Sequence, residues 1–284
     1  MQEFIFKMTC PDTVGIVAAV TKFIADNEGF ITSSSHYGDP VSNRFFMRTV
    51  FQPSGKTNFE LEDLKNKFLP IADKYSMEWD IHDSASRYRV LIAVSKFGHC
   101  LNDLLHKAKT GQIPIDIPAV VSNHPDIREI VEWYNIPYYH LPVTPENKAD
   151  QEGKLVKLAQ EFNIDLVVLA RYMQILSPEL TKILSGKCIN IHHSFLPSFK
   201  GAAPYQQAYQ RGVKIIGATA HYVTSDLDEG PIIEQAIERV DHSYGLNDLV
   251  NTGRDIETVV LSRAVKWHAE NRILLNGNKT VVFK

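Results

Sequence analysis

The sequence predicts an α/β protein: a doubly wound, mainly parallel sheet preceded by a smaller βαββαβ unit of the ferredoxin-like kind. From residue 88 onward, short apolar stretches alternate with helical patterns, as in parallel-sheet folds. The first 83 residues instead follow the order strand, helix, strand, strand, helix, strand. A short polar segment, residues 82–87, separates the two patterns. We therefore expect domains over 1–83 and 88–284, joined by a linker over 84–87.

Apolar periodicity and turn residues define the elements of the smaller domain. Val17, Val20, Phe23 and Ile24 recur at helical spacing, and Gly29 suits the position after the end of a helix. The turn before the third strand is rich in Gly, Asp, Pro, Ser and Asn. We expect strands over 3–9, 30–37, 45–52 and 77–81, and helices over 16–28 and 61–75.

The larger domain is predicted in the same way. The run Asp165–Ala170 is continuously apolar, which is typical of a strand buried on both faces of a parallel sheet. We expect strands over 89–94, 119–122, 138–141, 165–170, 188–192, 216–223 and 232–240, helices over 101–108, 127–134, 152–162 and 248–271, and a hairpin over 273–283. Ligands of such folds normally bind beyond the carboxyl ends of the strands.

Composition counts against several classes of protein. The chain has 284 residues, 44% hydrophobic and 22% charged, with a formal net charge of −3. That balance is normal for a globular protein and offers no electrostatic footprint for nucleic acid. Three widely spaced cysteines form neither a disulfide framework nor a zinc motif, which favours a reducing cytoplasm. Neither a membrane-spanning apolar run nor a signal peptide is expected.

Polar side chains gather where two predicted strands end. Asn190 and His192 are two residues apart on one strand, so they face the same side, whereas His193 should face the other. An amide and an imidazole can together polarise a carbonyl and move protons. Taken alone, they favour a polar strand end whose groups are satisfied by water or local backbone. Asp228 alone would be a turn former, and His221 a core histidine that orients a neighbour.

The motifs containing these residues resemble the signature of the folate-dependent formyltransferase superfamily. They read Asn190-Ile191-His192, Ser194-x-Leu196-Pro197-x-x-x-Gly201 and His221-x-Val223-x-x-x-Leu227-Asp228-x-Gly230-Pro231. The resemblance implies that Asn190, His192 and Asp228 are catalytic, with His221 and Gly230 supporting them. It also implies 10-formyltetrahydrofolate as the substrate, with no required cofactor and no metal.

The family's pterin-binding loop is similar in position to residues 170–176, which by pattern alone could also be a helix start. The folate-binding residues implied by the resemblance are Arg171, Met173, Gln174, Ile175, Leu176 and Val223. The implied mechanism holds the formyl carbonyl between Asn190 and His192, which stabilise the tetrahedral oxyanion. Asp228 orients His192 and takes or relays the proton of the nucleophile.

The segment after the first strand of the larger domain bears on the formyl acceptor. Superfamily members that formylate glycinamide ribonucleotide hold its phosphate on a Gly-Ser-Asn loop at a helix N-terminus. Here that segment reads Lys96-Phe97-Gly98-His99-Cys100, so phosphate is disfavoured, although Lys96 could still bind an anion. The run from His99 to Leu105 resembles the hydrolytic members. We expect Cys100 to be a small buried residue and not a nucleophile.

The N-terminal motif Thr9-Cys10-Pro11-Asp12-x-x-Gly15-Ile16-Val17 resembles the first strand, loop and helix of ACT domains. That resemblance implies an amino-acid effector near Asp12 and Gly15 and a homo-oligomer, dimer or tetramer. The same loop could be a structural turn, and the domain could serve oligomerisation alone.

Together the resemblances imply hydrolysis of 10-formyltetrahydrofolate to tetrahydrofolate and formate, which would supply formate to purine synthesis and balance the one-carbon folate pools. The alternatives are formyl transfer to a small amine such as glycinamide ribonucleotide, and a folate-binding regulator without turnover. An intact set of proton-transfer groups disfavours the regulator.

Overall fold

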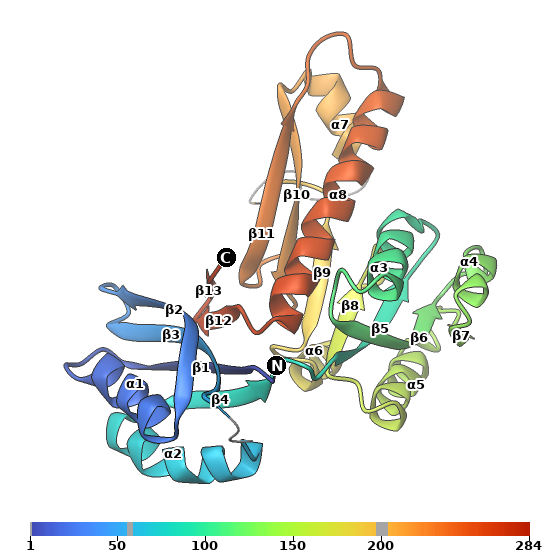
Figure 1. Ribbon diagram of the computed structural model, residues 1–284. Coiled ribbons are helices and arrows are strands. Elements are labelled where there is room, and N and C mark those ends of the chain that lie inside the picture. Colours follow the sequence, from blue (N-terminus) through green and yellow to red (C-terminus); the bar gives the residue numbers. More distant parts are fainter. Residues whose placement is uncertain (1, 56–58, 197–203) are drawn as a thin grey trace. The chain divides into compact units, whose positions relative to one another are not determined.

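The computed structural model describes residues 2–55, 59–196 and 204–284 (Figure 1). The chain forms two compact units, one of Met1–Arg87 with Glu270–Lys284 and the other of Tyr88–Ala269. Within the described residues, no helix combines the length and apolar character needed to cross a membrane.

The first unit is a four-stranded antiparallel sheet with two helices. The strands lie in the order β2 (Gly29–Asp39), β3 (Arg44–Pro53), β1 (Phe4–Pro11), β4 (Glu78–Asp83). The helices are α1 (Ile16–Asp26) and α2 (Leu61–Tyr75). Alternate β1 residues, from Phe4 to Cys10, pack with Phe23 and Phe68 of the helices in one buried cluster. These residues alternate along β1, as side chains on one face of a strand do.

The C-terminal hairpin belongs to this first unit, which differs from the expected domain boundary. It consists of β12 (Ile273–Asn276) and β13 (Lys279–Val282), with Gly277 at a positive φ in the turn. The buried Arg48 donates from Nε to the Asn271 carbonyl (3.1 Å), and Asn276 donates from Nδ2 to Asp39 Oδ2 (2.7 Å). Long-range polar contacts of this kind leave no periodic signal in a sequence, so the boundary at residue 269 was not predicted.

The second unit is built on a seven-stranded sheet in the order β11-β10-β9-β8-β5-β6-β7. The parallel strands are β5 (Tyr88–Val94), β6 (Ile115–Ser122), β7 (Tyr138–His140), β8 (Leu166–Leu169) and β9 (Cys188–His192). At one edge, β10 (Ile215–Tyr222) and β11 (Ile232–Arg239) run antiparallel. The predicted fold class, a mainly parallel doubly wound sheet after a βαββαβ unit, is confirmed.

The helices of this unit are α3 (His99–Lys109), α4 (Arg128–Trp133), α5 (Lys148–Glu161), α6 (Pro178–Ile183), α7 (Pro204–Arg211) and α8 (Leu246–Ala269). Side chains of α5 and α6 pack on the sheet face that contains Leu91 and Leu169, while α8 lies along β9, β10 and β11 (Figure 1). The two short helices α6 and α7 were not predicted. Helix α6 does carry a start signal, because the Ser177 hydroxyl caps the Leu180 N–H and Pro178 follows it.

The strand order reverses beside β5, because β6 lies on one side of it and β8 on the other. Such a switch point opens a crevice beyond the carboxyl ends of the strands. Ser95, just after β5, connects this strand end to the loop after β8. Its N–H donates to the Arg171 carbonyl (3.2 Å), and its Oγ accepts from the Met173 N–H (2.9 Å). The loop after β8 is thereby held at the edge where chemistry is expected.

Candidate active site

Strands β8, β9 and β10 place the polar side chains side by side. Asn190 pairs in register with Leu169 of β8 and with His221 of β10. His192 is the last residue of β9, and Asp228 lies in the loop between β10 and β11. The structure thus brings together Asn190, His192 and Asp228, which are up to 38 positions apart in the sequence.

The loop that carries Asp228 is held in a tight conformation. Tyr222 donates its N–H to the Pro231 carbonyl (2.9 Å), which closes the loop. Asp228 has φ 58, a left-handed conformation that Asp adopts more readily than most residues. A Cβ at Gly230 would lie 1.7 Å from the Tyr222 carbonyl oxygen, so only glycine fits there. The predicted supporting residue Gly230 therefore shapes the loop that presents Asp228.

Asp228 bridges the two histidines. Its Oδ2 lies 3.2 Å from His192 Nδ1, and its Oδ1 lies 3.7 Å from His221 Nε2. His221 Nδ1 lies 2.9 Å from the Tyr222 carbonyl, which can only accept, so this nitrogen carries a proton. In the neutral ring, Nε2 of His221 then accepts from the Asn190 amide (3.2 Å). His221 thereby orients the Asn190 amide. The second N–H of that amide remains free to donate to another group.

The charge of Asp228 is favoured by these contacts. Burial raises the pKa of this carboxyl group, but the neighbouring imidazoles of His192 and His221 lower it by more, so that it stays well below its ordinary value. Asp228 is therefore an ionised acceptor at neutral pH and keeps the proton of His192 on Nδ1. The opposite nitrogen, Nε2, is buried and has no hydrogen-bond partner among the described residues.

A cavity of about 360 Å³ opens in front of His192. Its lining includes Asn190, His192, His221 and Asp228 together with the whole predicted folate-binding set: Arg171, Met173, Gln174, Ile175, Leu176 and Val223. The loop 170–177 is not helical, so the alternative of a helix start there does not apply. The lining of the cavity is mostly apolar with a few convergent polar groups, which is typical of a small-molecule site.

His193 departs from the expectation that it faces away from His192. It follows the end of β9, where alternation no longer holds, and its ring stacks on that of His192 with centroids 4.8 Å apart. Burial, together with the charges of Arg171 and His192, lowers the pKa of His193 to about 4. His193 is therefore neutral at pH 7 and lies beside the reactive imidazole.

His193 predicts a pH dependence of stability. Its folded pKa of about 4 lies below the ordinary value of 6.5, so between these values the unfolded chain binds more protons. Relative to a His193→Gln variant, wild type should lose up to ~1.4 kcal/mol of unfolding free energy per pH unit below pH 6.5, and nothing above it. Urea denaturation of both proteins from pH 8 to pH 5 measures this difference. A constant difference over that range would contradict the prediction.

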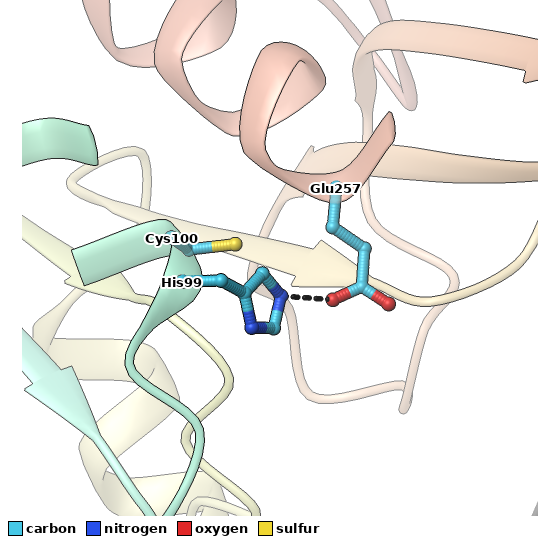
Figure 2. Close-up of side chains that lie close together, drawn as sticks. All are labelled: His99, Cys100 and Glu257. Atoms are coloured by element: carbon cyan, nitrogen blue, oxygen red, sulfur yellow. Dashed lines mark hydrogen bonds and ion pairs between the residues drawn. The ribbon is translucent and has the colours of Figure 1, made fainter. Parts of the chain in front are cut away.

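A second polar cluster lies beyond His193, and sequence reasoning missed it. His99, Cys100 and Glu257 offer atoms that all lie within 4.8 Å of one another (Figure 2). Glu257 is 1% exposed; its Oε2 lies 2.7 Å from His99 Nε2, and its Oε1 accepts from the Tyr205 hydroxyl (2.7 Å). A sequence signal did exist, because Glu257 lies on the buried face of α8, between Ile256 and Val260.

The cluster is better described as a hydrogen-bonded network than as a metal centre. Burial and the nearby Glu257 raise the pKa of the Cys100 thiol, whereas metal ligation requires the thiolate. Arg171 Nε lies 3.4 Å from Glu257 Oε2 and already compensates its charge. Cys100 is buried, as expected for a small residue in a helix. Lys96 is exposed.

The fold and the site define a class of protein. Residues 88–265, covering nearly the whole second unit, match the formyl transferase family. The chain is 49% identical over 280 residues to a formyltetrahydrofolate deformylase from Corynebacterium sp. (strain P-1), which covers 99% of this chain and 98% of the relative. The chain belongs to the formyltetrahydrofolate deformylases.

Solved structures agree with this assignment. A formyltetrahydrofolate deformylase from Burkholderia mallei superposes with a TM-score of 0.95 at 48% identity, covering all of both chains. A glycinamide ribonucleotide transformylase from Symbiobacterium toebii is less similar, with a TM-score of 0.65 at 28% identity, and covers 70% of this chain and 95% of its own. The likeness to the hydrolytic relatives therefore extends over the full chain, and the likeness to the transferase does not.

Proposed function

We propose that Asn190, His192 and Asp228 hydrolyse 10-formyltetrahydrofolate to tetrahydrofolate and formate. The chain is a formyltetrahydrofolate deformylase, a hydrolase that acts on the formyl C–N bond. The observation that carries the catalytic assignment is the ionised Asp228 on His192 Nδ1, which leaves a buried, unpartnered Nε2 at the cavity.

The folate is proposed to occupy the cavity in front of His192. Backbone and apolar side chains of residues 171–176 and Val223 line it and suit a flat heteroaromatic ring. The formyl group would then lie between the Asn190 amide and His192 Nε2. The free N–H of Asn190 donates to the formyl oxygen, since its other N–H is held by His221.

The reaction proceeds by attack of water on the formyl carbon. His192 and Asp228 accept the proton of the water as the new C–O bond forms, and the oxyanion accepts hydrogen bonds from Asn190 and the protonated His192. The C–N bond then breaks, and N10 takes that proton from the same network. One water is consumed and formate is released with a proton, so no redox partner is involved.

Formate release from 10-formyltetrahydrofolate, measured on purified protein without any added acceptor, tests this function. Steady formate production supports hydrolysis. Production that requires glycinamide ribonucleotide or another small amine would favour the transferase. Folate binding without either product would favour a regulator.

For the first unit we propose an ACT-type regulatory function. The N-terminus of α1 begins at Gly15, at φ 96, without a side-chain cap, so its N–H groups are available to a carboxylate. Asp12 is exposed in the same loop and could pair with an ammonium group. A free amino acid tied to one-carbon balance, such as glycine or methionine, fits these two charges. A homo-oligomer and a cytoplasmic location complete the proposal.

Calorimetry on the full chain tests the effector. Glycine or methionine is expected to bind wild type with measurable heat, and Asp12→Asn is expected to weaken binding about tenfold, because an ion pair to the ammonium group is lost. Asp73→Asn, an exposed carboxylate on α2, is the matched control. Absence of heat with every amino acid would leave the unit with an oligomerisation function.

A further inference from the structure

A second cavity of about 340 Å³ lies next to the first one and shares part of its wall. Arg171, Met173 and His193 line both cavities. The far side of the second cavity is formed by Phe97, Arg254 and the Glu257 network. Because the His193 ring stacks on His192, this second cavity begins one side chain away from the reacting carbon proposed above.

Arg171, in the wall that the two cavities share, is a buried cation with unused hydrogen-bond donors. Its side chain is 10% exposed, and neither Nε nor Nη1 donates a hydrogen bond to any of the residues that the structure describes. The contact of Nε with Glu257, at 3.4 Å, has ion-pair distance without hydrogen-bond geometry. A buried guanidinium with unmade hydrogen bonds is costly unless a ligand satisfies it.

The backbone of Arg171 adds a second, independent sign. Its φ is 63, in the left-handed region that glycine adopts most readily. Long side chains rarely occur there, and strained residues of this kind gather at ligand sites. The carbonyl of Arg171 is held by the Ser95 N–H, so the conformation that aims its guanidinium at the cavity is built in.

Arg254 gives the cavity a second cation. It stands one helical turn before Glu257 on α8 and lines the cavity. Its guanidinium lies over the Phe97 ring at 5.2 Å, and Arg171 approaches the same ring at 5.9 Å. Both guanidinium groups thus lie near one aromatic ring, and among the described residues that line the cavity one carboxylate, that of Glu257, offsets one of their charges.

We propose that this second cavity is a binding site for a small carboxylate, which receives the formate product through Arg171 and Arg254. The proposal rests on the hydrolytic function above. A planar guanidinium matches a carboxylate with two parallel hydrogen bonds. With tetrahydrofolate still in the first cavity, the formate ion lies between the anionic Asp228 and these two cations. It moves from the first cavity to the second past the neutral His193. The volume leaves space for formate and several waters.

Binding of [¹³C]formate to the full chain, followed by NMR line broadening in chloride-free buffer without folate, tests the site. Wild type should bind, and Arg254→Gln and Arg171→Gln should each weaken binding about tenfold or more, since each removes a charge-assisted hydrogen bond. Arg263→Gln, at an exposed arginine of the same helix, is the matched control and should bind as wild type does. Product inhibition by formate should weaken in parallel.

The outcomes separate this proposal from the function on which it rests. Active protein that fails to bind formate, or that binds it equally well in Arg254→Gln, overturns the site and leaves hydrolysis standing. If the protein is inactive as a hydrolase but binds formate through Arg171, the second cavity is not a site for the reaction product. Arg254 is half-buried on a helix surface, so its variant remains informative if Arg171→Gln fails to fold because Glu257 is left uncompensated.

Discussion

Asp228→Asn is expected to lower formate production by about 10²–10⁴-fold, the range for loss of general acid–base function. The substitution keeps the size of the side chain but removes the charge that stabilises protonated His192. An amide also offers an N–H to His192 Nδ1 and so favours the wrong tautomer of the ring. Stopped assays of formate release at pH 7.5, with 10-formyltetrahydrofolate at saturation, measure the effect.

Controls make this result specific to the Asp228 carboxylate. Asp255→Asn removes an exposed carboxylate from α8 and should leave turnover unchanged. Thermal unfolding of both variants distinguishes lost chemistry from lost structure. We expect little loss of stability in Asp228→Asn, because Gly230 and Pro231 already fix the shape of the loop. Wild-type turnover in Asp228→Asn would remove Asp228 from the mechanism.

Asn190→Ala should lower kcat by about 10²–10³-fold, the usual consequence of losing one oxyanion donor. The Asn190 amide is held by His221 and is proposed to donate its second N–H to the formyl oxygen, whose charge grows only in the transition state. The loss should therefore fall on kcat, with KM for the folate nearly unchanged. Steady-state kinetics with folate binding measured separately give both quantities.

Two companion variants sharpen the Asn190 experiment. Asn190→Asp keeps the shape but replaces the donor with an acceptor, and should be at least as inactive as the alanine variant. Asn251→Ala, at an exposed asparagine of α8, should behave as wild type. A rise in KM with unchanged kcat would show that Asn190 binds the ground state only, which would contradict its proposed function.

Chain-local rules predicted where polar groups would gather, and the family resemblance predicted which of them are catalytic. Asn190 and His192 share a face through the two-residue repeat of a strand, and that strand ends at the edge where a doubly wound sheet binds ligands. Asp228 stands in a turn whose glycine and proline are visible in the sequence. The folate-binding residues of the loop after β8 were implied by the family resemblance, and they line the same cavity.

The amino-acid sequence by itself determined the two fold classes and most of the strands and helices, because periodicity and turn chemistry act over a few residues. The motifs that resemble the formyltransferase signature singled out the three central polar residues. The tertiary structure decided which distant groups meet. Glu257 joins His99 and Arg171 over separations of 158 and 86 positions in the sequence. Residues 270–284 pack with the first unit through polar contacts with Lys7, Arg48 and Asp39. Contacts between such distant residues depend on packing of complete elements, which no local pattern encodes.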